Sequence, residues 1–327
     1  MKLAIVGATG AVGEVMLQIL GEKKFKFDEL ILFSSERSAG RKIHYNGREF
    51  IVRKLEDNCF DKVDIALFSA GGDISRKYCP LAAKAGALVI DNSSAFRMSE
   101  DIPLVVPEVN PEMITKCGII ANPNCTTIIL VTVLNRIFKE IGIEKIIVSS
   151  YQSASGAGAK GVNELLDQER DFVNNNSLKV NNFKHQLLHN VIPQIGNFTE
   201  NGFTEEEMKM VNETKKITGD YDLKISATCV RVPVLTSHSE SVFFTLKKDV
   251  SKEKLIELLS NSPGVVYSEN ENDYPMPLFT SGKDICYAGR LRKDNVFENG
   301  WSLWITGDQL RKGAALNAIQ IAEYARV

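Results

Sequence analysis

The sequence predicts an α/β fold in which a doubly wound parallel sheet is followed by a second, α+β domain. Short, continuous apolar runs alternate with helix-like segments between residues 2 and 121, a pattern typical of parallel strands that are buried on both faces. After residue 125 the strands become longer and alternate in polarity, as in residues 144–153. This second pattern suits an antiparallel sheet with one covered face. A chain of 327 residues also favours two domains.

The first domain is predicted element by element from its alternating strands and helices. Strands are expected at residues 2–6, 30–35, 64–70, 87–93, 104–109 and 118–121. After the first strand, apolar side chains recur at helical spacing. They are Val12, Val15, Met16, Ile19 and Leu20. Residues 76–86 predict another helix, which Gly86 ends. Strands and helices that alternate in this way favour parallel pairing through helical crossovers.

The second domain is expected to span residues 125–307. Helices are predicted near residues 160–173, 205–217, 251–260 and 311–325, and further strands at 225–234 and 240–248. The last of these helices is expected to return to the first domain, which then comprises residues 1–124 plus 308–327. Thr204 and Glu207 fit a capping box at the start of one helix. The polar stretch 174–182 indicates a surface loop.

The charge balance excludes some classes of partner. The chain carries 39 Lys and Arg against 41 Asp and Glu, which gives a net charge of −2. No global field therefore attracts nucleic acid or an anionic membrane. Any anionic ligand must instead be held by locally placed cations.

Cysteine and histidine usage argues against structural metals and disulfides. The six Cys have no paired short spacings, and there are only four His, so neither a zinc site nor a disulfide framework is predicted. No charged-then-apolar secretion pattern opens the chain, and no apolar run approaches about 18 residues. We therefore expect a cytoplasmic protein with reduced thiols.

Glycines at the first strand–helix junction indicate a dinucleotide site. Gly7, Gly10 and Gly13 follow a strand and open a helix, the context in which a backbone approaches a pyrophosphate closely. The spacing is G-x-x-G-x-x-G and not the commoner G-x-G-x-x-G, and such a turn can also be a mere tight connection. The strand–turn–helix context favours cofactor binding and a Rossmann-type first domain.

The choice between NAD and NADP depends on the end of the second predicted strand. NAD sites usually carry an acid there for the ribose 2′-hydroxyl, whereas NADP sites offer Arg and hydroxyl groups. Residues 34–38 read Ser-Ser-Glu-Arg-Ser. Arg37, flanked by serines, favours a 2′-phosphate, while Glu36 is the acid that NAD would need. We expect NADP, with Glu36 as the open question.

A thiol at a strand–helix junction is the candidate nucleophile. Cys125 lies between the apolar runs GIIA and IILVTVLNRIF, and a helix start favours thiolate over thiol through its dipole and its unpaired N–H groups. A free Cys also often merely fills space in a core. The junction alone leaves both interpretations open.

Four further polar residues are ambiguous from the residues alone. His238 is the one histidine in a rich setting, near Arg231, and a general base for acyl chemistry must titrate near neutrality. A core histidine and a structural ion pair are the alternatives. Glu206 and Lys209 share a helix face, and a solvated ion pair accounts for them equally well.

Taken together, the motifs resemble those of bacterial-type aspartate-β-semialdehyde dehydrogenases. The matching strings, in order, are VGATGAVG, SERSAG, ALFSAGG, DNSSAFR, PLVVPEVN, NPNCTT, YQSASGAG, EEMKM, CVRVPV, HSES and LRKGAALNAIQIAE. The resemblance spans nearly the whole chain, from residue 3 to about residue 325. Eleven strings in register over two domains are far more specific than any one of them.

The resemblance implies roles for individual residues. Cys125 matches the nucleophile that forms a thioester with the aspartyl group, Gln152 a residue that orients the intermediate, and His238 the acid/base. The substrate-binding residues would be Arg231 for the α-carboxylate, Glu206 for the α-amino group, and Arg97, Asn124 and Lys209 for phosphate. The NADP-binding residues would be Gly7, Thr9, Gly10, Ala11, Val12, Gly13, Arg37 and Ser38, with Ser155, Gly156 and Asn317 near the nicotinamide. No metal is implied.

The implied function is NADP-dependent reductive dephosphorylation of L-aspartyl 4-phosphate to L-aspartate 4-semialdehyde, in the pathway to Lys, Thr and Met. The first domain would bind NADP, and the second would carry catalysis and dimerisation in a homodimer. One alternative is a reductase of another acyl phosphate, such as N-acetylglutamyl phosphate; it is disfavoured because its substrate has no ammonium for Glu206. Another alternative is a non-catalytic NADP-binding regulator, which would be expected to lose Cys125 or His238.

The sequence departs from the resemblance between residues 158 and 194. This segment is shorter than in many relatives, and in relatives the region contributes to subunit contacts. The expected subunit contacts, and the choice between dimer and tetramer, are therefore the least determined part of the prediction.

Overall fold

The computed structural model describes residues 1–326 and divides the chain into two compact units. Unit 1 runs from Met1 to Asn124 and resumes at Ala314, and unit 2 comprises Cys125–Gly313. The first division coincides with the predicted one, but the second falls later than residue 307. The later boundary has a structural reason. Asp308 accepts the Gly282 N–H at 2.7 Å, and Arg311 is paired with Asp284 at 2.6 Å. These bonds keep residues 308–313 in unit 2.

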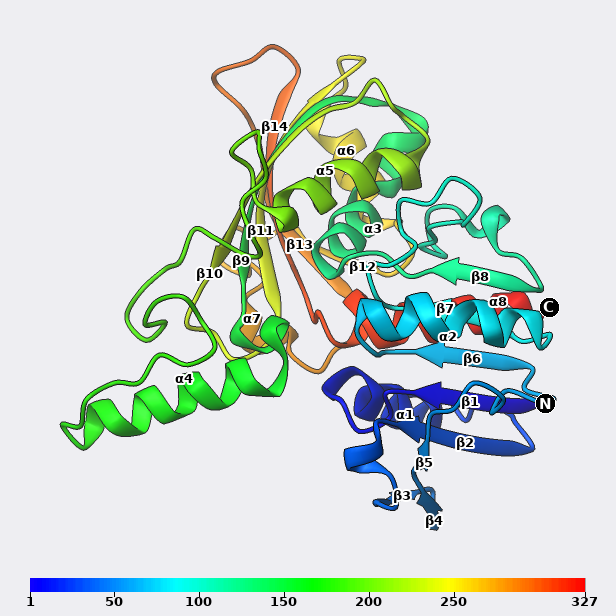
Figure 1. Cartoon of the computed structure of the whole chain (residues 1–327). Helices are drawn as coiled ribbons and strands as arrows, with labels where there is room; N and C mark the ends of the chain where they lie inside the picture. Colours follow the sequence, from blue (N-terminus) through cyan, green and yellow to red (C-terminus); the bar gives the residue numbers. More distant parts are fainter. Residues whose placement is uncertain (327) are drawn as a thin grey trace. The chain divides into compact units, whose positions relative to one another are not determined.

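Unit 1 is built on a six-stranded, fully parallel sheet (Figure 1). Its strands, in spatial order, are β5 (Arg53–Lys54), β2 (Glu29–Ser34), β1 (Lys2–Val6), β6 (Ile65–Phe68), β7 (Leu88–Asp91) and β8 (Gly118–Ala121). Helices α1 (Ala11–Glu22) and α8 (Leu316–Ala325) contribute to one apolar core, and α2 (Gly72–Lys84) contributes to the other. Alternate residues of β1 enter the two cores. Burial on both faces explains why the strands read as continuous apolar runs.

Two features of unit 1 differ from the sequence prediction. Residues 104–109 form no strand, and Leu104 makes only an isolated bridge to Ala121. Pro103 and Pro107 lack the N–H that a ladder needs. The sequence analysis also missed a hairpin of β3 (Lys42–Tyr45) and β4 (Arg48–Ile51). Asn46 and Gly47 have positive φ at its turn, as a two-residue hairpin requires. Short 3₁₀ turns are η1 (Glu36–Ser38) and η2 (Pro111–Met113).

Unit 2 contains a second six-stranded sheet, which is mixed rather than antiparallel. Its spatial order is β10 (Lys224–Arg231), β9 (Ile143–Gln152), β11 (His238–Leu246), β14 (Gly300–Gly307), β13 (Cys286–Lys293) and β12 (Val265–Ser268). The pairs β9–β10 and β12–β13 are parallel and the others antiparallel. Alternating polarity predicts one covered face but not strand direction, because direction depends on the long connections between strands.

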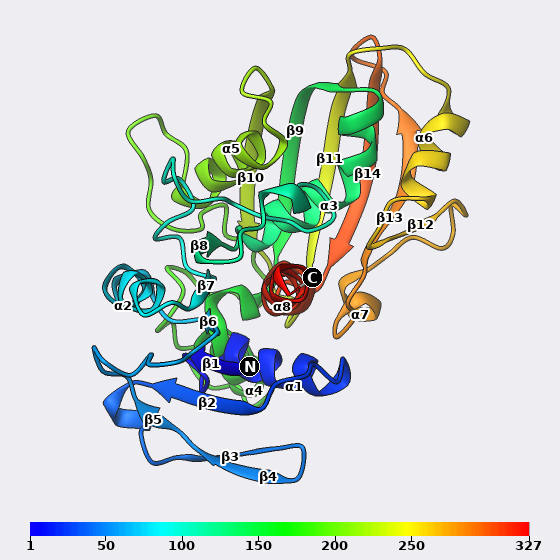
Figure 2. The same cartoon turned by 90° about the vertical axis from the view of Figure 1, so that its right-hand side faces the viewer.

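Helices cover one face of this second sheet. Figure 2 shows α3 (Cys125–Glu140), α5 (Glu205–Thr218) and α6 (Lys252–Ser260) on that face. The predicted capping box opens α5, because the Thr204 side chain accepts from Glu207 N–H and the Glu207 carboxylate accepts from Thr204 N–H. The remaining elements are η3 (Ala154–Ala157), α4 (Gly158–Val173), α7 (Pro277–Thr280) and the π-helical turn η4 (Arg311–Ala315).

The opposite face of the second sheet carries exposed apolar side chains. Ile147 is 51% exposed and Tyr151 37% exposed on β9, and Tyr151 packs on Trp304 of β14 with ring centroids 5.6 Å apart. Phe243 of β11 packs on Phe297 at 5.4 Å. An apolar sheet face of this kind marks an interaction surface.

A buried acid interrupts the apolar face under the helices. Glu240 on β11 is fully buried, and neither of its carboxyl oxygens has a hydrogen-bond partner. It lies across the sheet from Ser150 on one side and Ile305 on the other. Burial raises the pKa of Glu240 well above its ordinary value, because the charged form loses its hydration. The side chain is therefore a neutral acid in the folded protein.

We predict that Glu240→Gln flattens the pH dependence of stability. Between the unfolded and folded pKa values of Glu240, the folded protein holds one proton more than the unfolded chain, so the free energy of unfolding falls as pH rises, by about 1.4 kcal/mol per unit. Gln cannot ionise and removes this slope. Urea denaturation at several pH values above 5 measures it, with the exposed Glu298→Gln as control. An unchanged slope in Glu240→Gln would contradict the assignment of a neutral acid.

Candidate active site

The polar groups of unit 2 gather where three strands end or begin. Gln152 is the last residue of β9 and Arg231 the last of β10, and the two are register partners. His238 is the first residue of β11, which runs antiparallel to β9. The three side chains therefore belong to one end of the sheet, although 86 positions separate Gln152 from His238 in the sequence (238 − 152).

Arg231 is a buried cation anchored to the backbone. It is 6% exposed, and its Nη1 donates to the Ser153 carbonyl over 2.6 Å. Burial lowers the pKa of Arg231, while the negative charges of Glu206 and Cys125 oppose that shift. Cys125 thus lies within electrostatic range of the guanidinium. The anchored guanidinium retains donors in a planar fork, the geometry that binds a carboxylate through two bonds.

Gly156 keeps the space beside Arg231 and His238 open. A Cβ on this residue would lie 2.6 Å from Arg231 Nη1 and 3.2 Å from His238 Nε2. Any side chain here would displace a small ligand from both groups. A hollow of about 280 Å³ also reaches Arg231 from the side of residues 182–197, a size at the small end of ligand pockets.

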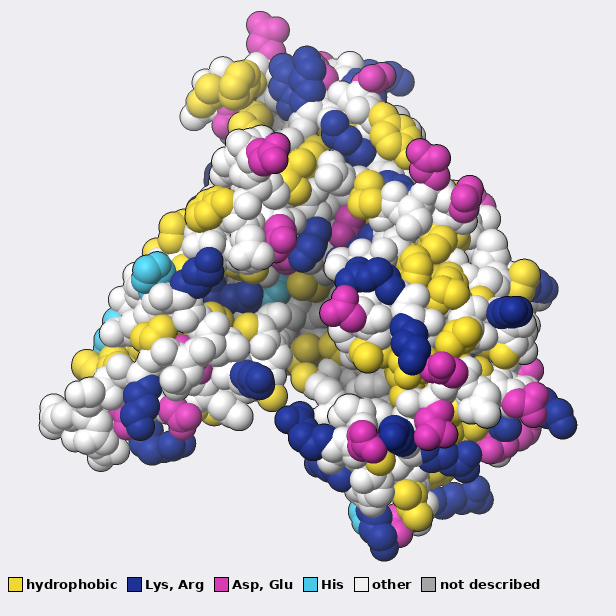
Figure 3. Space-filling model, in the orientation of Figure 1, with side chains coloured by type: hydrophobic (Ala, Val, Ile, Leu, Met, Phe, Trp, Pro, Cys, Tyr) yellow, Lys and Arg dark blue, Asp and Glu magenta, His cyan; other side chains and the backbone are white. Residues whose placement is uncertain are grey.

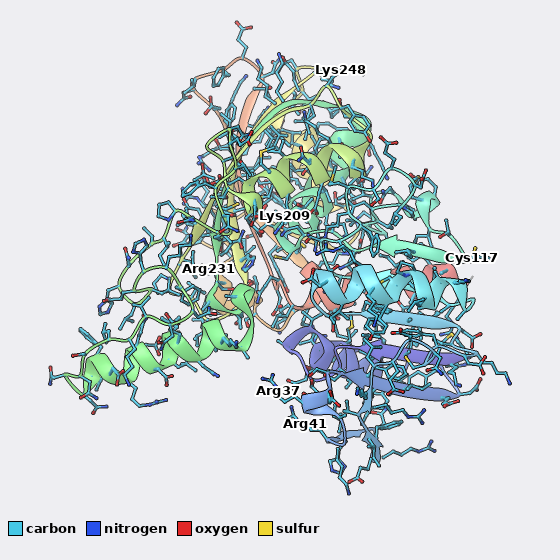
Figure 4. All side chains as sticks on the ribbon, in the orientation of Figure 1. Arg37, Arg41, Cys117, Lys209, Arg231 and Lys248 are labelled. Carbon is cyan, nitrogen blue, oxygen red and sulfur yellow. The ribbon has the colours of Figure 1, made fainter. Side chains whose placement is uncertain are left out.

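Glu206 is the buried acid of the site, and both of its oxygens are engaged. Oε1 accepts from Gln152 Nε2 at 3.3 Å, and Oε2 accepts from Lys209 Nζ at 3.0 Å. The side chain of Glu206 is only 9% exposed and that of Lys209 is 34% exposed. The alternative of a solvated helical ion pair therefore does not hold for this pair. Figure 4 shows Lys209 on α5 and Arg231 at the end of β10.

His238 is held in one tautomer. The Ser153 N–H donates to His238 Nδ1 at 3.1 Å, so Nδ1 is an acceptor and the proton of the neutral ring lies on Nε2. The Ser153 hydroxyl is also 3.1 Å from Nδ1 and 3.1 Å from the Ser155 hydroxyl. Gln309 Nε2 donates to the Ser155 hydroxyl, and Gln309 Oε1 accepts from Ser237 N–H at 2.8 Å. The ring is thus fixed from its Nδ1 side.

The surroundings of His238 oppose the expected titration near neutrality. Burial, reinforced by the positive charge of Arg231, lowers the pKa of His238 to about 3. His238 Nε2 is buried and has no hydrogen-bond partner. At pH 7 the residue is therefore a neutral ring whose N–H is directed at no protein group. Such a group is suited to donate a hydrogen bond to a ligand.

Cys125 occupies the first position of α3, as the sequence predicts. The thiol is half-buried, and no acidic residue lies in the first turn of the helix. A helix start without acids favours the thiolate. Gly313 packs against it so closely that a Cβ there would lie 2.9 Å from Cys125 Cβ.

The glycines of unit 1 have the geometry of a close strand–helix turn. Gly7 has φ +88°, and a Cβ on it would lie 2.8 Å from the Ser69 carbonyl. A Cβ on Gly13 would overlap the Gly7 carbonyl. Gly10 is the N-cap of α1, and Thr9 Oγ1 lies 2.8 Å from Ser34 Oγ at the end of β2. Ala11 and Val12 form the first turn of α1, where unpaired N–H groups attract phosphate.

A hollow of about 330 Å³ adjoins this turn. Its wall is apolar on one side and polar at the carboxyl end of β2. The lining residues are Val6, Gly7, Ser34, Ser35, Glu36, Lys54, Leu55, Ala70, Ile74 and Tyr78. Arg37 in η1 is exposed, whereas Ser38 is buried. The apolar side suits a base and the polar rim a ribose.

The other predicted residues of unit 1 are buried and structurally engaged. Arg97 is 8% exposed and donates to the carbonyls of Asn122 at 2.9 Å and Asn92 at 3.0 Å. Asn317 donates to Val105 O at 2.9 Å and Asn122 Oδ1 at 2.7 Å, and so ties α8 to the sheet. Asn124 is buried directly before Cys125 in the chain. The roles of these residues toward phosphate and nicotinamide remain predictions.

Sequence reasoning missed three residues of the unit 2 site. Ser153, Gln309 and Gly313 set the ring of His238 and the packing of Cys125. Ser153 and Gln309 lie within or beside motif strings, YQSASGAG and LRKGAALNAIQIAE. Their position in or beside these strings is the one feature from which Ser153 and Gln309 could have been predicted as site residues. The local pattern does not show which histidine these residues support.

The described residues contain neither a cluster of metal ligands nor a helix that could span a membrane. Among residues 1–326, no three His, Cys, Asp or Glu side chains come together as a metal ion would need. Within the same residues, no helix has the length and apolarity to cross a membrane. In the space-filling view of Figure 3, Lys and Arg are interspersed with Asp and Glu.

Comparisons with known proteins match both units. The family described as "Semialdehyde dehydrogenase, NAD binding domain" matches residues 2–117, and "Semialdehyde dehydrogenase, dimerisation domain" matches residues 134–312. Aspartate-semialdehyde dehydrogenases of Aquifex aeolicus and Bacillus subtilis are 50% and 48% identical to the chain, covering 98% and 99% of it and 97% and 96% of the relatives. A crystal structure titled as aspartate semialdehyde dehydrogenase II of Vibrio cholerae complexed with ASA has a TM-score of 0.96, with 46% identity over 99% of this chain and 97% of that one.

We predict that His238 stays neutral, with its proton on Nε2, throughout the neutral range. The other three histidines, His44, His185 and His189, are exposed. In ¹⁵N-labelled protein, long-range ¹H–¹⁵N spectra should show one ring, that of His238, which keeps its proton on Nε2 and does not titrate between pH 5 and 8. Protonation of the His238 ring above pH 6, or a proton on its Nδ1, would contradict the geometry.

Proposed function

Because the chain belongs to the aspartate-semialdehyde dehydrogenase family, we propose that it catalyses the NADP-dependent reductive dephosphorylation of L-aspartyl 4-phosphate to L-aspartate 4-semialdehyde, and the reverse reaction. This is a step of the aspartate pathway to Lys, Thr and Met. The observation that carries the proposal is the set of groups in unit 2: a helix-start thiol, a buried Arg, a buried Glu and a neutral His.

Cys125 supplies the nucleophile. Its thiolate attacks the acyl carbon of aspartyl phosphate, the C–S bond forms, and the C–O bond to phosphate breaks with release of inorganic phosphate. The product is a thioester, which is more electrophilic than a carboxylate. NADPH, when bound, supplies the hydride that reduces this carbonyl. Expulsion of the Cys125 thiolate then releases the aldehyde.

Arg231 and Glu206 bind the two charged groups of an α-amino acid. The guanidinium of Arg231 pairs with the α-carboxylate in a planar, two-bond contact. The carboxylate of Glu206 accepts from the α-ammonium. These two contacts orient the acyl carbon toward Cys125, so the reacting atoms need not find each other by chance. Gln152, bonded to Glu206 at 3.3 Å, holds the acid and reaches toward the acyl group.

His238 donates a hydrogen bond from Nε2–H to the reacting oxygen. Its Nε2–H is buried and has no protein acceptor. A donor in a dry site stabilises the negative charge that develops on the thioester oxygen during each addition step. The low pKa of His238 keeps the ring neutral at pH 7, so it stabilises the oxyanion by hydrogen bonding and not by full transfer of a proton.

The buried position of Glu206 distinguishes between acyl phosphates. An N-acetylated substrate such as N-acetylglutamyl phosphate has no ammonium, and its amide N–H is a poor partner for a buried carboxylate. The aspartyl substrate is therefore favoured. Arg97, Asn124 and Lys209 are proposed to bind the phosphate, and an ammonium that is 34% exposed, as in Lys209, can turn to an incoming anion.

A homodimer fits the exposed face of the second sheet. Ile147, Tyr151 and Trp304 form an apolar surface on the side away from the helices. β11 has a neighbouring strand on each side, so a second copy meets the face of the sheet and not the edge of β11. A reactive thiol requires a reducing compartment, in accord with the predicted cytoplasmic location.

One assay tests the proposed activity. NADPH formation is followed with aspartate semialdehyde, phosphate and NADP, and each is omitted in turn. Turnover is expected only when all three are present. Equal turnover with N-acetylglutamate semialdehyde, or turnover without phosphate, would contradict the proposal.

We predict that Cys125→Ala abolishes turnover and leaves the melting temperature within a few degrees of wild type. Ala is a good helix former and the change removes one half-buried sulfur. Iodoacetamide should inactivate the enzyme at the rate at which it labels Cys125, as followed by peptide mass spectrometry.

The matched control is Cys117, the exposed thiol. Cys117→Ala should keep full activity and the same rate of inactivation. The assignment of the nucleophile would be abandoned if inactivation followed the labelling of Cys117 or of half-buried Cys59 instead.

Substitutions of Arg231 and of His238 should affect different kinetic constants. Arg231→Leu is expected to raise the KM for aspartate semialdehyde and to lower kcat/KM roughly thirty- to a thousand-fold, since a buried charged contact is worth about 2–4 kcal/mol. Arg231→Lys should also be poor, because an ammonium cannot reproduce the fork. His238→Asn should lower kcat by about 10²–10⁴ with a smaller change in KM. Loss of kcat alone in the Arg231→Leu variant would reverse these roles.

A further inference from the structure

Lys54 places a positive charge at the nucleotide end of unit 1. It lies on β5, a strand that carries no cofactor motif. β5 pairs in parallel with β2, and the register sets Lys54 beside Ser34. Leu55 N–H donates to the Ser34 carbonyl at 3.2 Å, which holds the backbone on the far side of Lys54 as well. Lys54 is therefore fixed at the carboxyl end of β2. In doubly wound folds this is where the adenosine ribose lies.

Lys54 lines the same hollow as Gly7 and Glu36. Within residues 1–326, it is the one cationic side chain in that lining. Arg37, the cation that the sequence predicts for a 2′-phosphate, is exposed and lies outside the lining. Figure 4 labels Arg37, which belongs to η1. The hollow thus has a cation of its own, close to where the ribose oxygens would be.

Lys54 is bonded to the acid that left the cofactor preference open. Its Nζ donates to Glu36 Oε1 at 2.9 Å. This bond lowers the pKa of Glu36 and raises the pKa of Lys54, so both groups are charged at pH 7. Glu36 is consequently paired and is not a lone acceptor for a ribose 2′-hydroxyl, the role that an acid at this position has in NAD sites.

The pair is open to exchange with a ligand. The side chains are 81% exposed for Glu36 and 47% exposed for Lys54, and exposed ion pairs hold together weakly. An ammonium has three N–H donors. Lys54 can keep one bond to Glu36 and still direct charge-assisted bonds at a phosphate.

We propose that Lys54 is a cofactor-specificity residue, which neutralises Glu36 and binds the 2′-phosphate of NADP together with Arg37. The inference rests on the proposed use of NADP. Without Lys54, the Glu36 carboxylate repels the phosphate and accepts from the 2′-hydroxyl of NAD instead. The cofactor preference of this chain then depends on a residue of β5, which lies beside the end of β2 in space but outside the glycine motif and residues 34–38 in the sequence.

Direct binding of the two cofactors tests the proposal without relying on turnover. Titration calorimetry with NADP and with NAD is carried out on the full-length wild type and on Lys54→Met. The Kd for NADP is expected to rise about ten- to a hundred-fold in the variant, whereas the Kd for NAD does not rise. Lys54→Arg keeps a cation and should recover most of the NADP affinity.

A second substitution separates the two parts of the proposal. In an Glu36→Gln background there is no acid to neutralise, so any remaining loss on adding Lys54→Met reports contact with the phosphate. At least about a tenfold loss of NADP affinity is expected there. Glu36→Gln alone should keep NADP binding. Lys23→Met is the matched control, because Lys23 is paired with Glu323 at 2.9 Å in the same unit but lies outside the hollow.

Three results would overturn the proposal. They are an unchanged NADP affinity in Lys54→Met, an equal loss for NADP and NAD, and no loss on adding Lys54→Met to Glu36→Gln. Failure of the proposed function would give a different result. If the wild type binds NADP but does not turn over the semialdehyde, the binding measurements on the Lys54 variants can still be interpreted. Unchanged melting temperatures show that the variants are folded.

Discussion

Ser153 is the residue on which the arrangement of the unit 2 site depends. Its carbonyl accepts from Arg231 at 2.6 Å, its N–H donates to His238 Nδ1 at 3.1 Å, and its hydroxyl lies between His238 and Ser155. One residue thus positions the guanidinium of Arg231 and fixes the tautomer of His238. Because two of the three contacts use the backbone, they depend on where the chain leaves β9, and not on the serine side chain.

Burial decides how these groups behave chemically. A cation and a histidine that share a dry site oppose each other, so His238 stays neutral and Arg231 depends on the negative charges around it. Glu206 provides one such charge and the Cys125 thiolate another. A ligand that brings a carboxylate to Arg231 therefore completes the charge balance of the site. This favours an anionic amino acid as the substrate.

The nucleotide end of unit 1 follows a different principle, because its charged groups are exposed. Glu36 and Lys54 form a pair that water and salt weaken. Such a pair contributes little to folding, but it determines which charge a ligand meets at the end of β2. At the end of β2, specificity depends on whether Lys54 bonds to Glu36 or to a ligand. In unit 2, specificity depends on buried side chains that are held in fixed positions.

The two-domain plan, the parallel first sheet, the glycine turn and the helix-start position of Cys125 can be predicted from the sequence, because each is encoded by local periodicity or by a residue at an element boundary. The sequence also carried enough ordered motifs to indicate the family. It did not determine the mixed pairing of the second sheet, the neutral Glu240, the tautomer and low pKa of His238, or the pairing of Glu36 with Lys54. These depend on contacts between residues far apart in the chain, such as Ser153 with His238, and on the burial that such contacts create. A pKa or a tautomer is a property of surroundings, and only the tertiary structure brings those surroundings together.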